Sequence, residues 1–377
     1  MDAANYSENY DIYDYLEEGL ITEEIHPNFT TGETHHKVTD FHLSTVQIVA
    51  VLVYSITCLL GLLGNGLVIA IIILKIKKSI NAIWFLNLAA ADFLFNVFMP
   101  LNIIYTAMDY HWIFGKSMCK VNSLLLTFNM YTSVFLLTTI SVDRCILVVF
   151  PVWCQNHRSS KVAWLLCLLV WALGFFMSCP SLVFRDTELY QGNIICFNNF
   201  SLAQFPAHRT NSSWLSIKAY LEVAQERHLI LTVTRFVVGF IVPMTVITAC
   251  YTVIILRLKR NRLAKSKKPL RIIFAIILTF FLCWCPYHIL HLLETKHHLI
   301  PREVFKIGLP IVVAVASSNS CMNPVLYVFM GQDFKKFKMT LLSRLANALS
   351  EDTMHSSFPR RSFTKHSSLT EKETILL

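Results

Sequence analysis

One stretch of the chain, from Lys116 to Pro151, constrains the possible fold more than any other. It is predominantly apolar, with Cys119 near one end and the adjacent pair Asp143 and Arg144 near the other. At 1.5 Å per residue, a helix from Cys119 to Arg144 is roughly 37 Å long. This length exceeds the ~30 Å of hydrocarbon in a bilayer. The sequence therefore predicts a tilted membrane span with the cysteine at one surface and the charged pair at the other.

Six further apolar stretches satisfy the same length criterion. Hydrophobic residues make up 54% of the 377 residues and charged residues only 15%, which is typical of a polytopic membrane protein. The fold class predicted for residues 43–330 is an all-α bundle of seven transmembrane helices. The six further spans are expected at about 43–74, 80–108, 161–182, 228–256, 270–293 and 303–330.

The basic residues predict how the chain is oriented in the plasma membrane. Residues 257–271 hold eight Lys or Arg and no acid, and basic residues of this kind mark cytoplasmic connections. Residues 1–42 instead hold ten Asp or Glu, with Lys37 as the one strong base. We therefore expect an extracellular N-terminus and a cytoplasmic C-terminus. The net charge of +9 reflects this topology and does not indicate a nucleic-acid partner.

Both tails carry patterns of their own. The acidic tail 1–42 is expected to be disordered alone, and serves either to solubilise the protein or, with sulfated tyrosines, to capture a basic ligand. Residues 331–345 alternate bases with apolar residues, which predicts a short amphipathic eighth helix on the membrane lipid. Residues 346–377 form a Ser/Thr-rich cytoplasmic tail. Glycosylation sequons lie at Asn5, Asn28, Asn199 and Asn211.

Two of the eleven cysteines fall at or outside the predicted extracellular surface. These are Cys119, at the end of the third span, and Cys196, in the long connection 183–227. The other nine lie within spans or face the reducing cytosol, where free thiols are expected. A disulfide between Cys119 and Cys196 is therefore predicted.

Polar side chains inside the spans indicate a second kind of site. Asp92 is the one acid within its hydrophobic stretch, and an intramembrane carboxylate marks either a functional site or a structural hydrogen-bond node. Asn129 and Ser133 lie four residues apart and share a helical face. With Asn323 and the neighbouring Ser320, they supply oxygens around one carboxylate, as a hard cation requires. We predict an allosteric sodium ion here and no other cofactor.

The motifs of the successive spans, taken together, resemble those of a rhodopsin-like (class A) G-protein-coupled receptor. The matching residues are Gly64-Asn65, Leu88-Ala-Ala-Ala-Asp92, Cys119, Asp143-Arg144-Cys145, Trp171, Pro243 with Tyr251, Trp284-Cys-Pro286-Tyr and Asn323-Pro324-Val-Leu-Tyr327. Within the family, the chemoattractant branch is similar in five segments. They are Trp84-Phe-Leu-Asn-Leu, Asp109-Tyr-His-Trp, Pro180-Ser-Leu-Val-Phe-Arg-Asp-Thr, Cys196-Phe-Asn-Asn-Phe and Gly331-Gln-Asp-Phe-Lys-Lys-Phe.

This resemblance implies a cell-surface receptor for a peptide or protein chemoattractant. It also implies signalling through a heterotrimeric inhibitory-type G protein and arrestin, in chemotaxis and inflammation. The residues assigned by resemblance to the conformational switch and G-protein contact are Asp143, Arg144, Tyr251, Trp284, Pro286, Asn323, Pro324 and Tyr327. Arrestin control is expected from phosphorylation of Ser356, Ser357, Ser362, Thr364, Ser367, Ser368 and Thr370.

Arg235 is the strongest candidate for contact with a ligand. An unpaired guanidinium in the outer half of a span costs at least ~2.5 kcal/mol, so Arg235 should face the bundle and meet an acceptor. That acceptor is either the C-terminal carboxylate of a peptide or, alternatively, Glu294, unless the side chain extends to the interface. Further candidate ligand contacts are Arg185, Glu294, Asn122 and Ser123.

Other classes of function fit the sequence less well. The chain has no phosphate-binding loop, nucleophile motif or metal-spaced ligand set, so no enzyme is predicted. A transporter would normally show inverted repeats and paired broken helices, which are absent. A decoy receptor that internalises peptide without coupling is the alternative within the class, and the intact Asp143 and Arg144 pair argues against it.

Overall fold

The computed structural model describes residues 44–75, 79–190, 192–202, 214–260, 268–296 and 299–330. At positions 75, 214–221, 268–273, 276, 302 and 325–330, only the backbone is described. Within these ranges, seven helices are long and apolar enough to cross a membrane, which confirms the predicted seven-span α-helical fold. The predicted eighth helix at 331–345 and both tails lie outside the described residues.

The spans are formed by ten helical elements. The first three spans are the single helices α2 (Thr45–Lys75), α3 (Ile80–Ala107) and α4 (Gly115–Val149). A short helix α5 (Pro151–His157) then precedes the fourth span, which consists of α6 (Ser160–Ser178) and α7 (Pro180–Phe184). The fifth span comprises α8 (Trp214–Phe236), η1 (Val237–Ile241) and α9 (Val242–Arg260), and the last two are α10 (Lys268–Glu294) and α11 (Arg302–Met330).

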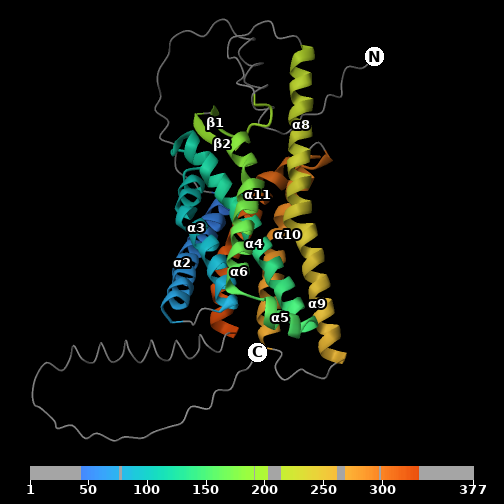
Figure 1. The fold of residues 1–377 in the computed structure, drawn as a ribbon. Coiled ribbons are helices and arrows are strands. Elements are labelled where there is room, and N and C mark those ends of the chain that lie inside the picture. The colour runs from blue at the N-terminus through green and yellow to red at the C-terminus, as the bar shows by residue number, and fades with distance from the viewer. Residues whose placement is uncertain are drawn as a thin grey trace, which may run out of the picture. The chain divides into compact units, whose positions relative to one another are not determined.

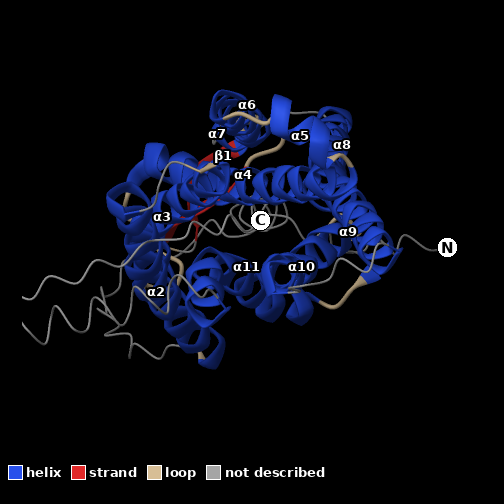
Figure 2. Cartoon of the chain, turned by 60° about the horizontal axis from the view of Figure 1, so that its bottom comes forward, coloured by secondary structure: helices blue, strands red, loops and turns tan. Residues whose placement is uncertain are grey.

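α4 holds the bundle together. It packs against α3, α6 and α9, and Figure 2 shows it running through the bundle between α6 and the pair α10 and α11. The remaining side of the bundle closes through contacts of α2 with α3 and α11, and of α11 with α10. Consequently, Cys119 and Arg144 lie near opposite ends of one helix that packs against the second, fourth and fifth spans. We refer to these ends of the bundle as the Cys119 end and the Arg144 end.

The fifth span starts earlier than predicted and contains an irregular turn. The expected range was 228–256, whereas the helical run extends from Trp214 to Arg260. Five residues, Val237–Ile241, adopt a wide π-helical turn directly before Pro243, which has no backbone N–H to continue the α-helical pattern. The Val242 N–H instead donates to Val237 O. The sequence indicated the proline but not the compensating turn.

The described part of the connection 183–227 contains two strands. Strands β1 (Arg185–Tyr190) and β2 (Asn193–Asn198) form an antiparallel hairpin, labelled in Figure 1, with Thr187 opposite Cys196. Gly192 in the turn has φ +87°, a conformation that glycine adopts without steric cost. No strand was predicted here because the segment lacks a long alternating apolar pattern.

The Gly64-Asn65 motif explains how closely α2 approaches α11. A Cβ atom on Gly64 would lie 2.7 Å from Cβ of Pro324, so any larger residue would push the two helices apart. Beside it, buried Asn65 donates a 2.8 Å hydrogen bond to the carbonyl of Ser320. Small and amide side chains of this kind are how helices associate within a membrane.

Candidate functional site

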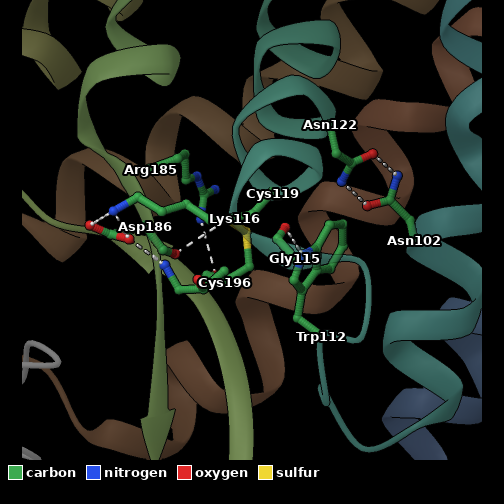
Figure 3. The surroundings of a disulfide bond; sticks show 10 residues. Asn102, Trp112, Gly115, Lys116, Cys119, Asn122, Arg185, Asp186 and Cys196 are labelled. Carbon is green, nitrogen blue, oxygen red and sulfur yellow. Dashed lines mark hydrogen bonds and ion pairs between the residues drawn. A yellow bond between two sulfur atoms is a disulfide. The ribbon is translucent and has the colours of Figure 1, made fainter.

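The predicted disulfide between Cys119 and Cys196 is present. It joins α4 to β2 with a Cα–Cα distance of 5.7 Å, as Figure 3 shows. The Trp112 N–H adds a 2.7 Å hydrogen bond to the Ile194 carbonyl, and the indole of Trp112 donates to Gly115 O. The hairpin is therefore attached to the Cys119 end at several points.

An ion pair fixes the first strand to the same helix. Lys116 Nζ lies 2.8 Å from Asp186 Oδ1, and Figure 3 shows the two side chains facing each other. Burial would raise the pKa of the Asp186 carboxyl, but hydrogen bonds from Lys116 and the Thr187 N–H hold that pKa below its usual range. Asp186 therefore stays ionised at neutral pH. Because Lys116 is half exposed, the pair contributes little to stability by itself.

Asn122, a predicted ligand contact, is already paired with another amide. Its side chain donates to Asn102 Oδ1 at 2.9 Å and accepts from Asn102 Nδ2 at 3.3 Å, which links α4 to α3 (Figure 3). The neighbouring prediction, Ser123, is buried with only 9% of its surface exposed. Asn122 and Ser123 therefore take part in the packing of α4 at the Cys119 end of the bundle.

Arg235, Arg185 and Glu294 come together at the Cys119 end. Arg235 Nη1 donates a 3.0 Å hydrogen bond to the Tyr287 hydroxyl, while Arg185 Nη1 donates to the Cys196 carbonyl at 3.3 Å. The two guanidinium groups also interact electrostatically with each other and with Glu294. Burial lowers the pKa of the Arg185 guanidinium, although neighbouring Tyr105 opposes the effect.

The alternative partner for Arg235 does not form a direct ion pair with it among the described residues. The recorded ion pair of Glu294 is instead with His291, whose Nδ1 lies 2.7 Å from Glu294 Oε2. The acceptor that Arg235 does find, Tyr287, was not singled out from the sequence, although it directly follows Pro286. Two guanidinium groups around one carboxylate leave this cluster with an excess of positive charge. Such a cluster favours an anionic group of a ligand.

Next to this cluster, Trp284, one of the residues assigned to the conformational switch, packs among aromatic side chains. Trp284 is 1% exposed, and its ring centroid is 5.4 Å from that of Tyr287 and 6.1 Å from that of Phe280. Pro286 lies inside the continuous helix α10, between Trp284 and Tyr287 in the sequence. Tyr287 thus contacts both Arg235 and Trp284.

Asp92 is fully buried and hydrogen-bonded by the residues that the sequence placed around it. Asn323 Nδ2 donates to Asp92 Oδ2 at 2.7 Å, and Ser133 Oγ donates to Asp92 Oδ1 at 3.3 Å. Asn129 Oδ1 lies 3.4 Å from the same serine hydroxyl. Ser320 is also fully buried, but its hydroxyl donates to Ser317 O within its own helix. Asp92, Ser133, Asn129 and Asn323 therefore form one hydrogen-bonded group, and the sodium ion expected there stays a prediction.

At the Arg144 end of the bundle, Asp143 forms an ion pair with Arg158 and not with its neighbour Arg144 among the described residues. Both carboxylate oxygens of Asp143 accept hydrogen bonds from Arg158, at 2.7 and 2.9 Å. Arg144 interacts electrostatically with Tyr251 of α9, another predicted switch residue. The backbone of Tyr327 lies in α11, and its side chain is not among those described. Arg158 was missed because a lone arginine in a short basic connection looks like a topology signal.

Several predicted modification sites fall outside the described residues. Of the four sequons, only Asn199 is described, and its side-chain oxygen accepts hydrogen bonds from Ser201 Oγ and the Leu202 N–H. The remaining sequons and all the predicted phosphorylation sites lie outside the described ranges, namely Asn5, Asn28, Asn211, Ser356, Ser357, Ser362, Thr364, Ser367, Ser368 and Thr370.

Comparison with known proteins agrees with this geometry. Residues 64–327 match the family described as 7 transmembrane receptor (rhodopsin family). The chain belongs to this family of rhodopsin-like G-protein-coupled receptors. The receptor is 60% identical over 333 residues to chemerin-like receptor 1 of Sus scrofa, covering 88% of this chain and 91% of the relative.

Two further relatives extend the comparison. The receptor is 53% identical to chemerin-like receptor 1 of Bos taurus, with both chains fully covered. It is also 37% identical to the C3a anaphylatoxin chemotactic receptor of Oncorhynchus mykiss, over 94% of this chain and 91% of that one. The protein is therefore a multi-pass plasma-membrane receptor of the peptide chemoattractant group and not an enzyme.

Proposed function

We propose that this receptor responds to a chemerin-like peptide or protein whose free C-terminus enters the bundle from the Cys119 end. The name of the relatives that are 53–60% identical suggests the ligand class. The observation that carries the proposal is the cluster of Arg235 with Arg185, which belongs to a hairpin that the disulfide joins to α4. Lys and Arg counts in the connections support an extracellular position for this end.

The cluster suits a carboxylate for two reasons. A guanidinium is planar and binds a carboxylate through two parallel hydrogen bonds, whereas Arg235 now meets neutral hydroxyls, those of Tyr287 and Tyr131. Glu294, the nearby acid, is held by His291 and so competes weakly for Arg235. An incoming C-terminal carboxylate would therefore replace a neutral acceptor with a charged one.

Agonist binding at this cluster would favour one of two packings of the bundle. A ligand shifts such an equilibrium only to the extent that it binds one packing more tightly. The contact from Arg235 through Tyr287 to Trp284 offers a route, since moving the Tyr287 hydroxyl disturbs the ring packed 5.4 Å from it. Farther in, Asp92 and Asn323 join α3 to α11, where we propose that a sodium ion favours the inactive packing.

The cytoplasmic outcome is proposed to be activation of a heterotrimeric inhibitory-type G protein through Arg144, followed by arrestin recruitment to the phosphorylated tail 346–377. Chemotaxis and inflammatory signalling are the expected cellular responses. The polar residues of the Arg144 end, namely the partly exposed Asp143 and Arg144 and the buried Tyr251, favour this reading over a decoy receptor. A decoy requires binding and internalisation but no intact coupling face.

The proposal is tested in membranes from cells that express the full chain. A panel of chemoattractant peptides with free C-termini is applied, and nucleotide exchange on inhibitory-type and stimulatory-type G proteins is measured. Peptide-dependent exchange on the inhibitory type alone is expected. Binding and internalisation of peptide without exchange on any G protein would establish the decoy alternative. Peptide flux across sealed vesicles without exchange would establish a transporter.

A further inference from the structure

Arg158 forms a side-chain ion pair with Asp143 at the Arg144 end of the bundle. Its Nε donates to Asp143 Oδ1 at 2.7 Å and its Nη2 to Asp143 Oδ2 at 2.9 Å, so the pair is bidentate. The same Nη2 donates to Asn81 Oδ1 of α3 at 2.9 Å. The side chains are only 22% and 12% exposed for Arg158 and Asp143. A partly buried, bidentate arginine–carboxylate pair is stronger than the common surface ion pair.

The backbone around Arg158 is fixed as well. The residue lies between α5 and α6, and its N–H donates to the Cys154 carbonyl at 3.0 Å. The next residue, Ser159, caps α6 by accepting a hydrogen bond from the Val162 N–H. Cys154 is buried against the bundle. The guanidinium therefore reaches Asp143 from an ordered support and loses little conformational freedom in doing so.

The pairing of Arg158 with Asp143 affects Arg144, the next residue in the chain. Both oxygens of Asp143 are used by Arg158, and among the described residues Arg144 forms no ion pair. Within the same described part of the chain, the buried Nε of Arg144 has no hydrogen-bond partner. Arg144 nevertheless interacts electrostatically with both Asp143 and Arg158. The guanidinium groups of Arg144 and Arg158 thus both interact with the carboxylate of Asp143, and Arg158 is the one that forms hydrogen bonds with it.

We propose that Arg158 is a positioning residue for coupling: it occupies Asp143 and so keeps Arg144 available to the cytoplasmic partner. Without Arg158, the carboxylate of Asp143 would capture the adjacent guanidinium of Arg144. The receptor would then have to break a charge-assisted hydrogen bond before Arg144 could bind a G protein. The inference rests on the proposed coupling function, because the availability of Arg144 matters only to a receptor that couples.

The deciding experiment compares four proteins: the wild type, Arg158→Ala, Asp143→Asn and the double variant Asp143→Asn with Arg158→Ala. Each is purified in full length and reconstituted with an inhibitory-type G protein, and nucleotide exchange is measured at saturating agonist. Arg158→Ala should slow exchange by about tenfold, the size expected for one charge-assisted hydrogen bond that must be broken. The double variant should exchange as fast as Asp143→Asn and clearly faster than Arg158→Ala, since the neutral amide of Asn no longer attracts Arg144.

Recovery separates positioning from a merely structural role. If Arg158 only anchored the connection between α5 and α6, the double variant would be as slow as Arg158→Ala, and that result would overturn the proposal. Equal exchange by Arg158→Ala and the wild type would overturn it too. Asn81→Ala, which removes one contact of Arg158 and leaves Asp143 intact, should give a smaller loss in the same direction. It serves in place of Arg158→Ala if that variant does not fold.

A measurement without G protein distinguishes this inference from the proposed function. If the wild type activates no G protein, the coupling proposal fails, and thermal unfolding then tests the pair directly. The melting temperature is measured for Asp143→Ala, Arg158→Ala and their double variant. The fall in this double variant should be smaller than the sum of the falls in the two single variants, because both changes remove the same interaction. Additive losses would show that Arg158 does not hold Asp143 in the receptor.

Discussion

Asn323 donates a 2.7 Å hydrogen bond to Asp92, although 231 residues separate them in the chain. The bond joins α11 to α3 at a point where both side chains are buried, at 3% and 0% exposure. Ser133 of α4 donates to the other oxygen of the same carboxylate. One acid therefore connects three helices, and any movement of α11 relative to α3 must change its surroundings.

This relationship makes the sodium site the first testable prediction. Replacing sodium by a large organic cation should raise agonist affinity by on the order of fivefold, the usual scale of coupling between two sites. Asp92→Asn should abolish that dependence, because a neutral amide cannot balance the charge of a buried cation. Agonist competition binding in the two salts measures the effect. A buried serine within one helix, replaced as Ser178→Ala, is the matched control and should keep the dependence. An unchanged sodium dependence in Asp92→Asn would place the ion elsewhere.

The second prediction concerns Arg235 and the C-terminal carboxylate of the peptide. Arg235→Ala should weaken the response to a free-acid peptide by about tenfold or more, the loss expected for a charge-assisted pair. Amidating the peptide should weaken its action on the wild type to a similar extent. On the variant, amidation should add little, because both changes remove the same interaction.

The control for this cycle is a second arginine of the same helix. Arg227 donates to the backbone carbonyls of Phe200 and Ser201, so Arg227→Ala should leave the effect of amidation intact. Concentration–response curves for both peptides on all three receptors complete the test. Full potency of the amidated peptide on the wild type would contradict the assignment, as would additive losses.

A third prediction follows from the disulfide that holds the hairpin. Cys119→Ser should lower the free energy of unfolding by about 2–5 kcal/mol, because it frees a segment whose ends are 77 residues apart. Agonist affinity should fall with it, since Arg185 would lose its fixed position in β1. Thermal unfolding and ligand binding of detergent-solubilised receptor report the two effects. Cys179→Ser, which alters a free thiol, should change neither quantity appreciably. Cys196→Ser combined with Cys119→Ser should be no worse than either alone.

The fourth prediction concerns the tail that follows the bundle. Truncation after Leu349 removes the seven serines and threonines from Ser356 to Thr370 and should abolish agonist-driven arrestin recruitment while sparing G-protein activation. Each phosphate adds a charge of about −1.5 to −2, which basic surfaces on a partner can bind. A full-length chain with alanine at those seven positions should behave like the truncated one. Retained recruitment in either protein would contradict the prediction, and a resonance-energy-transfer assay between receptor and arrestin measures it.

The sequence by itself determined the number of spans and several of the functional contacts. Apolar length predicted seven helices because a bilayer requires about twenty apolar residues for each crossing, a condition that needs no knowledge of neighbouring segments. The disulfide between Cys119 and Cys196 followed from the compartment that each cysteine faces. The grouping of Asp92 with Ser133 and Asn323 followed from the scarcity of polar residues at membrane depth.

The tertiary structure alone decided which partner each charged group takes. Arg235 meets the neutral hydroxyl of Tyr287, and Asp143 turns to Arg158 although Arg144 is its neighbour in the chain. The length, composition and charge of a segment predict that a buried charge needs a partner, but the sequence offers several partners that would satisfy that need equally well. The choice depends on how the helices pack, because hydrogen bonds hold only within a few tenths of an ångström of their preferred length.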